Sequence, residues 1–212
     1  FYTSLNGMLI SAYIKAFRTL RDKRLKDFAL KSLERIMEIH FPDNELLHTE
    51  GVKALLDDYI YLIDAVIAAY EITGNHSYLN RADEFMGLCI KKFWDNDGGG
   101  FFDTEEEIIG MRLKGIEDIS HPSANSLGII LLLKLYCMTN KDSYQQFAEK
   151  ALNAFSLGVR DMGIFAGYYF SSVDAYYNML KLTLETSHES ELADTALSFP
   201  IPHTSMVYGE DK

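Results

Sequence analysis

The amino-acid sequence predicts an all-α fold, namely a partial (α/α) toroid of antiparallel helical hairpins with a small C-terminal β element. Three observations support this prediction. Apolar segments with helical period alternate with amphipathic ones, the pairing occurs three times in one register, and the loops between pairs are far longer than the turns within them. Such a toroid has an inner layer of enclosed helices and an outer layer that faces water.

The inner helices are expected where the apolar residues cover most faces of the predicted helix, at 6–20, 57–73 and 123–139. Each is followed, after a short polar turn, by a segment with one apolar stripe and one charged face. These outer helices are expected at 24–40, 77–93 and 143–157.

Alanine occupies one fixed position in each outer helix, as Ala29, Ala82 and Ala148. A small residue at a repeated position indicates close helix–helix contact, because a larger side chain would push the two axes apart. A superhelical solenoid is the competing architecture, but its repeats tend toward constant length, whereas the connections here grow along the chain.

The pattern changes after the third hairpin. A fourth inner helix is expected at 165–178, a strand at 179–185, a short helix at 190–197 and a second strand at 205–208. We therefore divide the chain into helical hairpins over residues 1–180 and a β or irregular tail over 181–212. Because three and a half hairpins do not close a ring, we expect a preceding segment or another subunit to complete it.

The long loops, 40–56 and 94–122, should gather at the end of the ring where the inner helices begin. Long loops on a rigid scaffold commonly carry function, and helix N-termini direct unsatisfied N–H groups toward that face. Asn6, Asp57 and Ser123 are suitable N-cap residues there. The sequence thus predicts a site at the N-terminal ends of the inner helices.

Two carboxylates in this region, Asp58 and Asp118, are the candidate catalytic pair, since glycoside hydrolysis needs two carboxyl groups across the scissile bond. Helix capping, or ion pairing with Arg112 and Lys114, is the alternative role for both. Arg112 and Lys114 are two positions apart on an expected strand, so their side chains would point to one side and could hold a carboxylate or phosphate. Structural salt bridging is the alternative. Asn125 is the polar residue expected to face inward.

Other polar groups in the loops suggest further chemistry. His48 and His121 are the histidines expected on the loop face, where a sugar epimerase would need a proton-transferring pair. The acidic residues from Asp95 to Glu106 have the spacing of a calcium loop, but a glycine-turned β-hairpin accounts for the same residues. We expect no metal and no cofactor.

Composition narrows the partners. A formal net charge of −11 argues against nucleic acid and against an anionic membrane surface. The sequence has no apolar run of about 18 residues, so no membrane-spanning helix is expected. Cys89 and Cys137 have no CxxC spacing and are expected to be buried free thiols, which is typical of a protein of the reducing cytoplasm.

Several motifs occur together in the order typical of one family. They are Asn6-Gly7-Met8-Leu9-Ile10, Asp58-Tyr59, Phe93-Trp94-Asp95, Gly98-Gly99-Gly100-Phe101-Phe102, Arg112-Leu113-Lys114, Asp118 and Pro122-Ser123-Ala124-Asn125-Ser126. In this order the chain, from about residue 4 to 185, resembles the YyaL-like proteins, the thioredoxin-domain-containing, spermatogenesis-associated family. Leu5 and Ala124 depart from that family's pattern, which tends to have Trp and Gly there.

The resemblance implies the later part of a helical toroid similar to six-hairpin glycosidases and N-acylglucosamine 2-epimerases. It favours a carbohydrate-active or sugar-binding toroid, and if the protein is an enzyme it would be a glycosidase-like hydrolase or a sugar epimerase. The alternative is a non-catalytic helical scaffold for protein–protein interaction. The expected ligand is a small molecule such as a carbohydrate, and the residues expected to bind it are Asn6, Tyr59, Phe102, Arg112, Lys114, Ser123 and Asn125.

Overall fold

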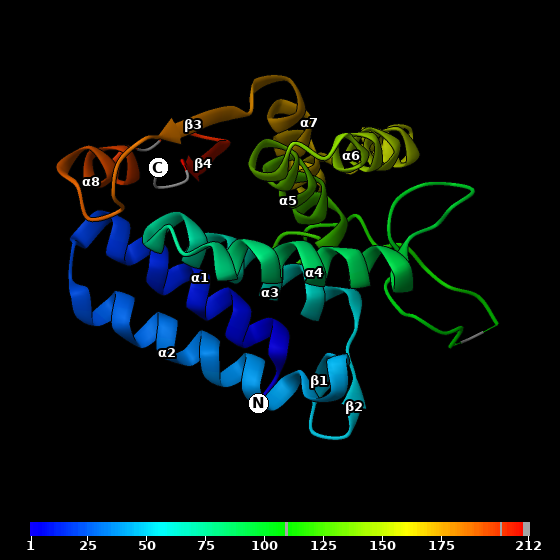
Figure 1. Ribbon diagram of the computed structural model, residues 1–212. Helices are drawn as coiled ribbons and strands as arrows, with labels where there is room; N and C mark the ends of the chain where they lie inside the picture. Colours follow the sequence, from blue (N-terminus) through cyan, green and yellow to red (C-terminus); the bar gives the residue numbers. More distant parts are fainter. Residues whose placement is uncertain (109, 200, 210–212) are drawn as a thin grey trace.

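The computed structural model describes residues 1–108, 110–199 and 201–209, and it is mostly helical (Figure 1). The chain forms α1 (Thr3–Leu20), α2 (Lys23–His40), α3 (Leu56–Thr73), α4 (His76–Phe93), α5 (Ala124–Thr139), α6 (Asp142–Phe155), α7 (Gly167–Asn178) and α8 (Glu191–Ser198). Short strands are β1 (Leu47–Thr49), β2 (Val52–Lys53), β3 (Leu180–Leu184) and β4 (Thr204–Tyr208), and 3-10 turns lie at Pro42–Asn44, Gly158–Asp161 and Gly163–Ala166.

The helices form the two predicted layers. Inner helices α1, α3, α5 and α7 pack on one another in sequence order, and α2, α4 and α6 each pack on the inner helix of their own pair. The central inner helices α3 and α5 are buried on most of their faces, whereas the outer helices bury one stripe. This arrangement confirms a partial α/α toroid with a small β element.

The repeated hairpin register is confirmed by burial and by the turns. Ala29, Ala82 and Ala148 are all completely buried, as close helix–helix contact requires. Each inner helix of a pair ends in a left-handed residue whose N–H bonds a carbonyl of the last turn. Those residues are Arg21 (φ 57°), Gly74 (φ 63°) and Asn140 (φ 55°).

The tail lies across the C-terminal ends of the inner helices. Strand β3 pairs with β4 in parallel, from Leu180 opposite Thr204 to Leu184 opposite Tyr208, and β4 packs on α5 and α3. Buried Glu71 accepts from Lys134 at 2.8 Å and from the Met206 N–H at 3.4 Å. The predicted strands and short helix are confirmed, the division at residue 180 stays a prediction, and residues 200 and 210–212 of that tail lie outside the described residues.

Three sequence-based expectations were wrong. Helix α1 begins at Thr3 and α3 at Leu56, so Asn6 and Asp57 lie inside the first turn, and only Ser123 is an N-cap. Residues 112 and 114 lie in irregular chain, since their backbone groups do not continue a ladder. Cys89 is buried as expected, whereas Cys137 is only half-buried.

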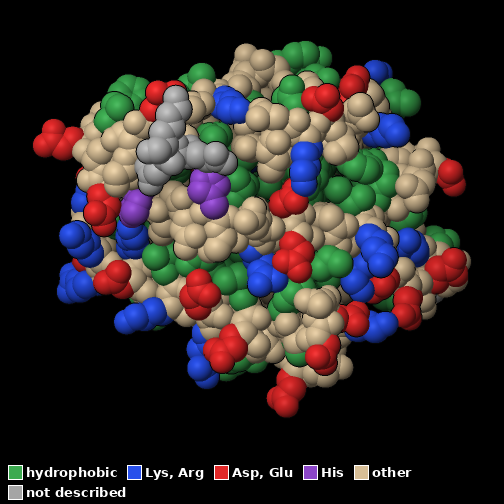
Figure 2. Space-filling model, viewed as in Figure 1, with side chains coloured by type: hydrophobic (Ala, Val, Ile, Leu, Met, Phe, Trp, Pro, Cys, Tyr) green, Lys and Arg blue, Asp and Glu red, His purple; other side chains and the backbone are tan. Residues whose placement is uncertain are grey.

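The long loops contain local structure that positions the site. The 40–56 loop folds into the antiparallel β1–β2 hairpin, which the sequence analysis missed. The glycine-rich segment forms the predicted hairpin, with a bridge between Trp94 and Phe101 and positive φ at Gly99 and Gly100. Acidic and basic side chains are interspersed on the face in Figure 2, without a patch of one sign. None of the described helices is long and apolar enough for a membrane span.

Candidate functional site

The N-terminal ends of the four inner helices are joined in series by hydrogen bonds. The Ser4 N–H of α1 donates to Asp58 of α3 at 2.9 Å. The hydroxyl of Tyr61, one turn further along α3, donates to the carbonyl of Pro122, just before α5. Asp118 then links α5 with α7. We call this end of the molecule the rim; it confirms that the inner helices begin together.

Asp118 bridges two helix starts with its two carboxylate oxygens. Oδ1 accepts the N–H of Ser123 at 2.8 Å, and Oδ2 accepts the N–H of Tyr168 at 2.7 Å. Both bonds satisfy orphan donors at helix starts, which is the capping role considered from the sequence. A catalytic role for Asp118 stays a prediction. In that role the carboxylate would have to react while it accepts hydrogen bonds from two backbone N–H groups.

Asp58 is completely buried and also has a full set of donors. Its Oδ1 accepts the Ser4 N–H at 2.9 Å, and its Oδ2 accepts the Leu55 N–H at 2.9 Å. The ring Nδ1 of His48 lies 2.9 Å from Oδ2 and 3.1 Å from Oδ1. A carboxylate on which two backbone N–H groups converge is an acceptor, so the imidazole must be the donor.

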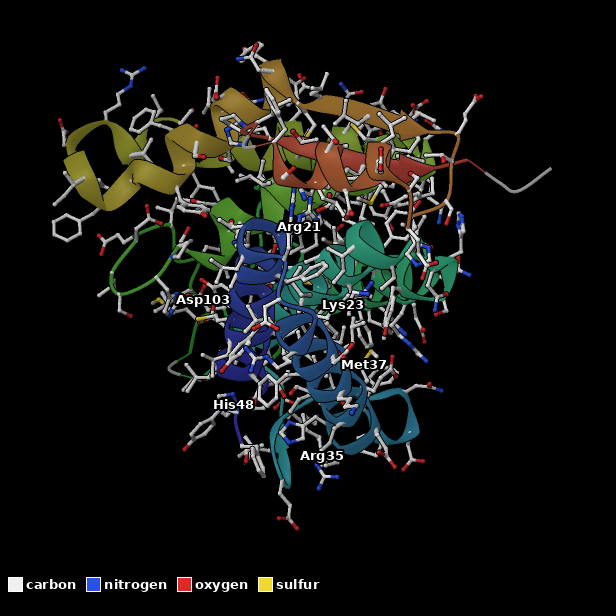
Figure 3. The ribbon with its side chains drawn as sticks, turned by 90° about the vertical axis from the view of Figure 1, so that its left-hand side faces the viewer. Arg21, Lys23, Arg35, Met37, His48 and Asp103 are labelled. Atoms are coloured by element: carbon white, nitrogen blue, oxygen red, sulfur yellow. The ribbon has the colours of Figure 1, made fainter. Side chains whose placement is uncertain are left out.

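His48 stands on β1 and remains partly accessible. Its side chain is 26% exposed, and the ring of Tyr2 lies against it with the centroids 5.0 Å apart. Figure 3 labels His48 and Asp103 toward the N-terminal end of α1, and Arg21 at its other end. The imidazole is therefore held by α1 and α3 but still reaches solvent at the rim.

Asp57 is the half-buried neighbour of Asp58. Burial raises the pKa of its carboxyl, and the negative charges of Asp58 and Asp103 raise it further. The positive charges that His121 and His48 can carry oppose this shift and lower the pKa, and burial remains the larger effect. Asp57 therefore holds its proton to a higher pH than an ordinary aspartate does.

Further titratable groups surround Tyr61. Its hydroxyl oxygen lies 2.9 Å from Nδ1 of His121, whose ring contacts the tyrosine ring edge-on. Burial raises the pKa of Tyr61, and nearby negative charge raises it further. We call this group the Tyr61 cluster; the groups that act on Tyr61 are Asp57, Asp64, Asp118, His121 and Tyr168.

The Tyr61 cluster is what the sequence analysis missed. Asp57, Tyr61 and Asp64 stand at positions i, i+4 and i+7 of an otherwise apolar helix, so they share one face. That spacing can be seen in the sequence. The sequence does not show that the loop before α5 and Tyr168 contribute to the cluster, because their position depends on how α5 and α7 pack.

The predicted binding residue Asn125 is completely buried and holds the loops together. Its Oδ1 accepts the Phe101 N–H at 2.7 Å, and its Nδ2 donates to the carbonyls of Phe101 at 2.9 Å and Gly115 at 2.8 Å. Ser123 caps α5, with its hydroxyl accepting the Ser126 N–H at 3.1 Å. Contact of either residue with a ligand stays a prediction.

Phe102 lies between the two predicted basic residues. The guanidinium of Arg112 is 4.2 Å from the ring centroid, and the ammonium of Lys114 is 5.4 Å away. Arg112 donates to the carbonyls of Thr104 and Lys92, both at 2.8 Å. Lys114 pairs with Asp95 at 2.8 Å. Lys114 therefore has a structural ion pair, as the alternative proposed, and Arg112 bonds backbone carbonyls, while ligand binding by either residue stays a prediction.

The remaining two candidates differ in position. Asn6 is partly exposed on the first turn of α1 and donates to the Tyr2 carbonyl at 2.8 Å. Tyr59 is buried, with its ring 5.6 Å from that of Phe93 on α4, so it faces the outer layer. A contact between Tyr59 and a substrate stays a prediction. For a substrate bound at the rim to reach Tyr59, α3 would have to move relative to α4.

Cavities lie near the rim and at the opposite end. One of about 330 Å³ is bordered by Lys53, Leu55 and Glu105, beside the start of α3. Another of about 510 Å³ lies near the C-terminal ends of α1 and α3, between Phe17, Lys26 and Leu197. Neither of these two cavities is lined by a predicted site residue.

No family model matches the chain. The chain is 27% identical over 167 residues to an uncharacterized protein of Caenorhabditis elegans, covering 73% of this chain and 23% of that protein. It is 26% identical over 194 residues to spermatogenesis-associated protein 20 of Homo sapiens, covering 83% and 25% respectively. The chain therefore spans about a quarter of the length of these relatives.

The fold is similar to that of carbohydrate-active enzymes. A GH76 α-mannanase of Bacteroides thetaiotaomicron gives a TM-score of 0.66 at 16% identity, covering 83% of this chain and 52% of that one. An inactive variant of an α-1,6-mannanase of Salegentibacter sp., in complex with α-1,6-mannotetraose, gives 0.63 at 13%, covering 92% and 60%. A cellobiose 2-epimerase of Spirochaeta thermophila gives 0.56 at 15%, covering 73% and 42%. The chain is thus similar, as its motifs suggest, to spermatogenesis-associated protein 20, and it has the α/α-toroid fold found in these glycosidases and epimerases.

Proposed function

We propose that the rim binds a carbohydrate and that the chain is the sugar-handling part of a carbohydrate-active toroid. The observation that carries this proposal is the Tyr61 cluster, which gathers carboxyl, imidazole and phenol groups where four inner helices begin. Sugar hydroxyls need such closely spaced donors and acceptors, and aromatic rings beside them can pack on the apolar face of a sugar.

The similar structures support the same ligand class. The Salegentibacter mannanase was captured with α-1,6-mannotetraose, and the variant that carries replacements at two adjacent aspartates is inactive. This chain also has two adjacent aspartates, Asp57 and Asp58, at the start of an inner helix. Of the two, Asp57 is the accessible one, with a pKa raised by burial, as a proton-donating acid requires.

We assign the predicted catalytic residues distinct parts in this proposal. Asp57 contacts the ligand and supplies a proton. Asp58 and Asp118 are positioning residues, because their oxygens already accept backbone donors at the helix starts. The reaction class is acid–base chemistry on a sugar, either hydrolysis or epimerisation, and neither needs a cofactor in this proposal.

The similar toroids are longer than the part that this chain matches. The chain covers 52% of the Bacteroides mannanase and 60% of the Salegentibacter one. We propose that a further segment or another subunit completes the wall of the site, and that the protein acts in the cytoplasm. This part of the proposal is separable from ligand binding by the rim residues.

The test is ligand mapping by two-dimensional NMR with the wild-type chain. Addition of α-1,6-mannotetraose, and separately of cellobiose, should shift amide resonances at the starts of α3 and α5. Asp57→Asn should weaken binding by about tenfold, which corresponds to loss of one good hydrogen bond. Asp27→Asn, an exposed carboxylate on α2, is the matched control and should bind as wild type does.

Three outcomes would contradict the proposal. The first is the absence of any binding of either saccharide at millimolar concentration. The second is binding that maps to the tail or to α8, since the ligand would then use the opposite end of the inner helices. The third is equal weakening of binding by Asp57→Asn and Asp27→Asn, because it would show a general charge effect instead of contact with the rim.

A further inference from the structure

His48 and Asp58 form a dyad that the sequence analysis did not pair. They are ten positions apart, on β1 and α3, and the ring Nδ1 lies 2.9 Å from Oδ2 and 3.1 Å from Oδ1. The carboxylate has no exposed surface, whereas the imidazole is 26% exposed. One partner is therefore fixed inside the protein, and the other presents its remaining edge outward.

The hydrogen bonds determine where the imidazole proton resides. Asp58 already accepts the N–H groups of Ser4 and Leu55, one on each oxygen. Such a carboxylate can only accept from His48, so Nδ1 carries a proton. Neutral His48 must then keep the lone pair on Nε2. Among the residues that the structure describes, none forms a hydrogen bond with Nε2.

Two further contacts hold the ring in this orientation. The Tyr2 ring packs on it at 5.0 Å with a tilt of 42°. The carboxylate is itself fixed because the N–H of Ser4 in α1 donates to its Oδ1 and the N–H of Leu55, the N-cap residue of α3, donates to its Oδ2. A histidine held at Nδ1 by a buried carboxylate, with Nε2 left open, is arranged for proton transfer.

The charges that face this dyad come from neighbouring elements. His40 on α2 interacts electrostatically with both Asp58 and His48, and positive charge on His48 or His121 acts on the carboxyl of Asp57. Burial raises the pKa of Asp57, so this residue holds its proton to a higher pH. The rim thus contains a base with a fixed lone pair and an acid that retains its proton.

We propose that His48 is a general base of the rim and that Asp58 is its positioning residue. Nε2 takes the proton from an O–H group of the bound saccharide or of a water beside it. The O–H bond breaks, its electron pair stays on the oxygen, and the new N–H bond makes the ring an imidazolium. Asp58 remains ionised and stabilises that charge through Nδ1–H. This inference rests on the carbohydrate function proposed above.

The first test is the tautomer of His48, read from its ring ¹⁵N resonances in long-range ¹⁵N–¹H spectra. We expect neutral His48 to be protonated at Nδ1, the reverse of the preference of a free histidine. Asp58→Asn should raise the share of the Nε2–H form. If that variant does not fold, the wild-type spectrum alone decides, and an Nε2–H tautomer in it overturns the proposal.

The second test adds α-1,6-mannotetraose or cellobiose to the same sample. The Nε2 resonance of His48 should shift, whereas that of His188, which lies near the opposite end, should not. His48→Gln should bind the saccharide within about threefold of wild type and lower any turnover by about 100-fold, the lower end of the contribution of a general base. Asp27→Asn, at an exposed position on α2, is the control that should keep both saccharide binding and turnover as in the wild type.

The outcomes separate this inference from the function on which it rests. Binding at the rim with no shift of Nε2 would overturn the role of His48 and leave carbohydrate binding in place. Unchanged turnover in His48→Gln would do the same. Absence of saccharide binding would overturn both proposals together.

Discussion

Gly7 of α1 approaches the backbone of Tyr61 in α3 so closely that a Cβ at residue 7 would lie 2.6 Å from the Tyr61 carbonyl oxygen. The contact is with main-chain atoms, which cannot rotate out of the way as a side chain can. It sets the distance between the first two inner helices at the rim, since both residues stand within two turns of a helix start.

We therefore expect Gly7→Ala to lower the free energy of unfolding by about 2 kcal/mol, since overpacking a well-packed contact costs about 1–3 kcal/mol. The matched control is Gly87→Ala on α4, where an added Cβ meets nothing within 4 Å. That exposed helical position should gain about 0.5–1 kcal/mol. Urea denaturation of both variants tests the pair, and two changes of the same sign would contradict the account.

The raised pKa of Asp57 at the rim predicts that the free energy of unfolding depends on pH. Because burial raises the folded-state pKa of Asp57 above its ordinary value, ionisation of this group opposes folding. Its favourable contribution is complete below the unfolded-state value and is lost as pH rises through the raised value. Asp57→Asn removes this dependence.

The measurement is the free energy of unfolding of the wild type and of Asp57→Asn between pH 3 and pH 7. Relative to the wild type, the variant should become progressively more stable as pH rises. Asp27→Asn should show no such trend, since Asp27 is exposed. A difference between wild type and Asp57→Asn that stays constant over this range would contradict the prediction.

Asn125 should be the main support of the loop between α4 and α5, because its amide makes three hydrogen bonds to backbone groups of that loop. Asn125→Ala leaves those buried groups unpaired, and each unsatisfied group costs about 1–3 kcal/mol. Because partial relaxation of the loop reduces this cost, we expect the free energy of unfolding to fall by about 2–4 kcal/mol. Hydrogen exchange at the Phe101 amide should accelerate in the variant more than exchange in α2.

Asn96→Ala is the control for this prediction, since Asn96 is exposed in the same hairpin. It should change stability by less than about 0.5 kcal/mol. Protection of the Phe101 amide that survives in Asn125→Ala would show that other contacts hold the hairpin.

The tail should depend on Glu71, which is buried between two cations and the tail backbone. Lys134 lies 2.8 Å and Arg18 3.6 Å from its carboxylate oxygens, and Met206 donates its N–H at 3.4 Å. Glu71→Ala leaves Lys134 without its anion at the partly buried end of α5, so we expect a loss of about 3 kcal/mol, within the range for a broken buried pair.

Limited proteolysis tests this prediction directly. The variant should be cut sooner within residues 185–205, because β4 loses its anchor to α3. Glu189→Ala, which removes an exposed acid from the same end, should be cut at the wild-type rate. Faster cleavage in both variants would show that the effect comes from the change in net charge and not from loss of the buried Glu71 carboxylate.

The sequence alone determined the layers and the register of this protein. Periodicity distinguishes enclosed helices from half-exposed ones, and the small residue at one position of each outer helix marks their contact, because both properties repeat along the chain. Ala29, Ala82 and Ala148 show this, since all three are completely buried. The resemblance to the spermatogenesis-associated family came from motif order, which is also a property of the sequence.

Only the tertiary structure decided which polar side chains are free to act. From the sequence, Asp57 and Asp58 are two adjacent aspartates at a helix start, and no local pattern distinguishes the buried one from the half-buried one. Asp58 became the buried partner of His48 because α1 and the β1–β2 hairpin fold over it, and Asp57 stayed at the surface of the rim. Burial and hydrogen-bond partners arise from packing between distant segments, and no local pattern records them.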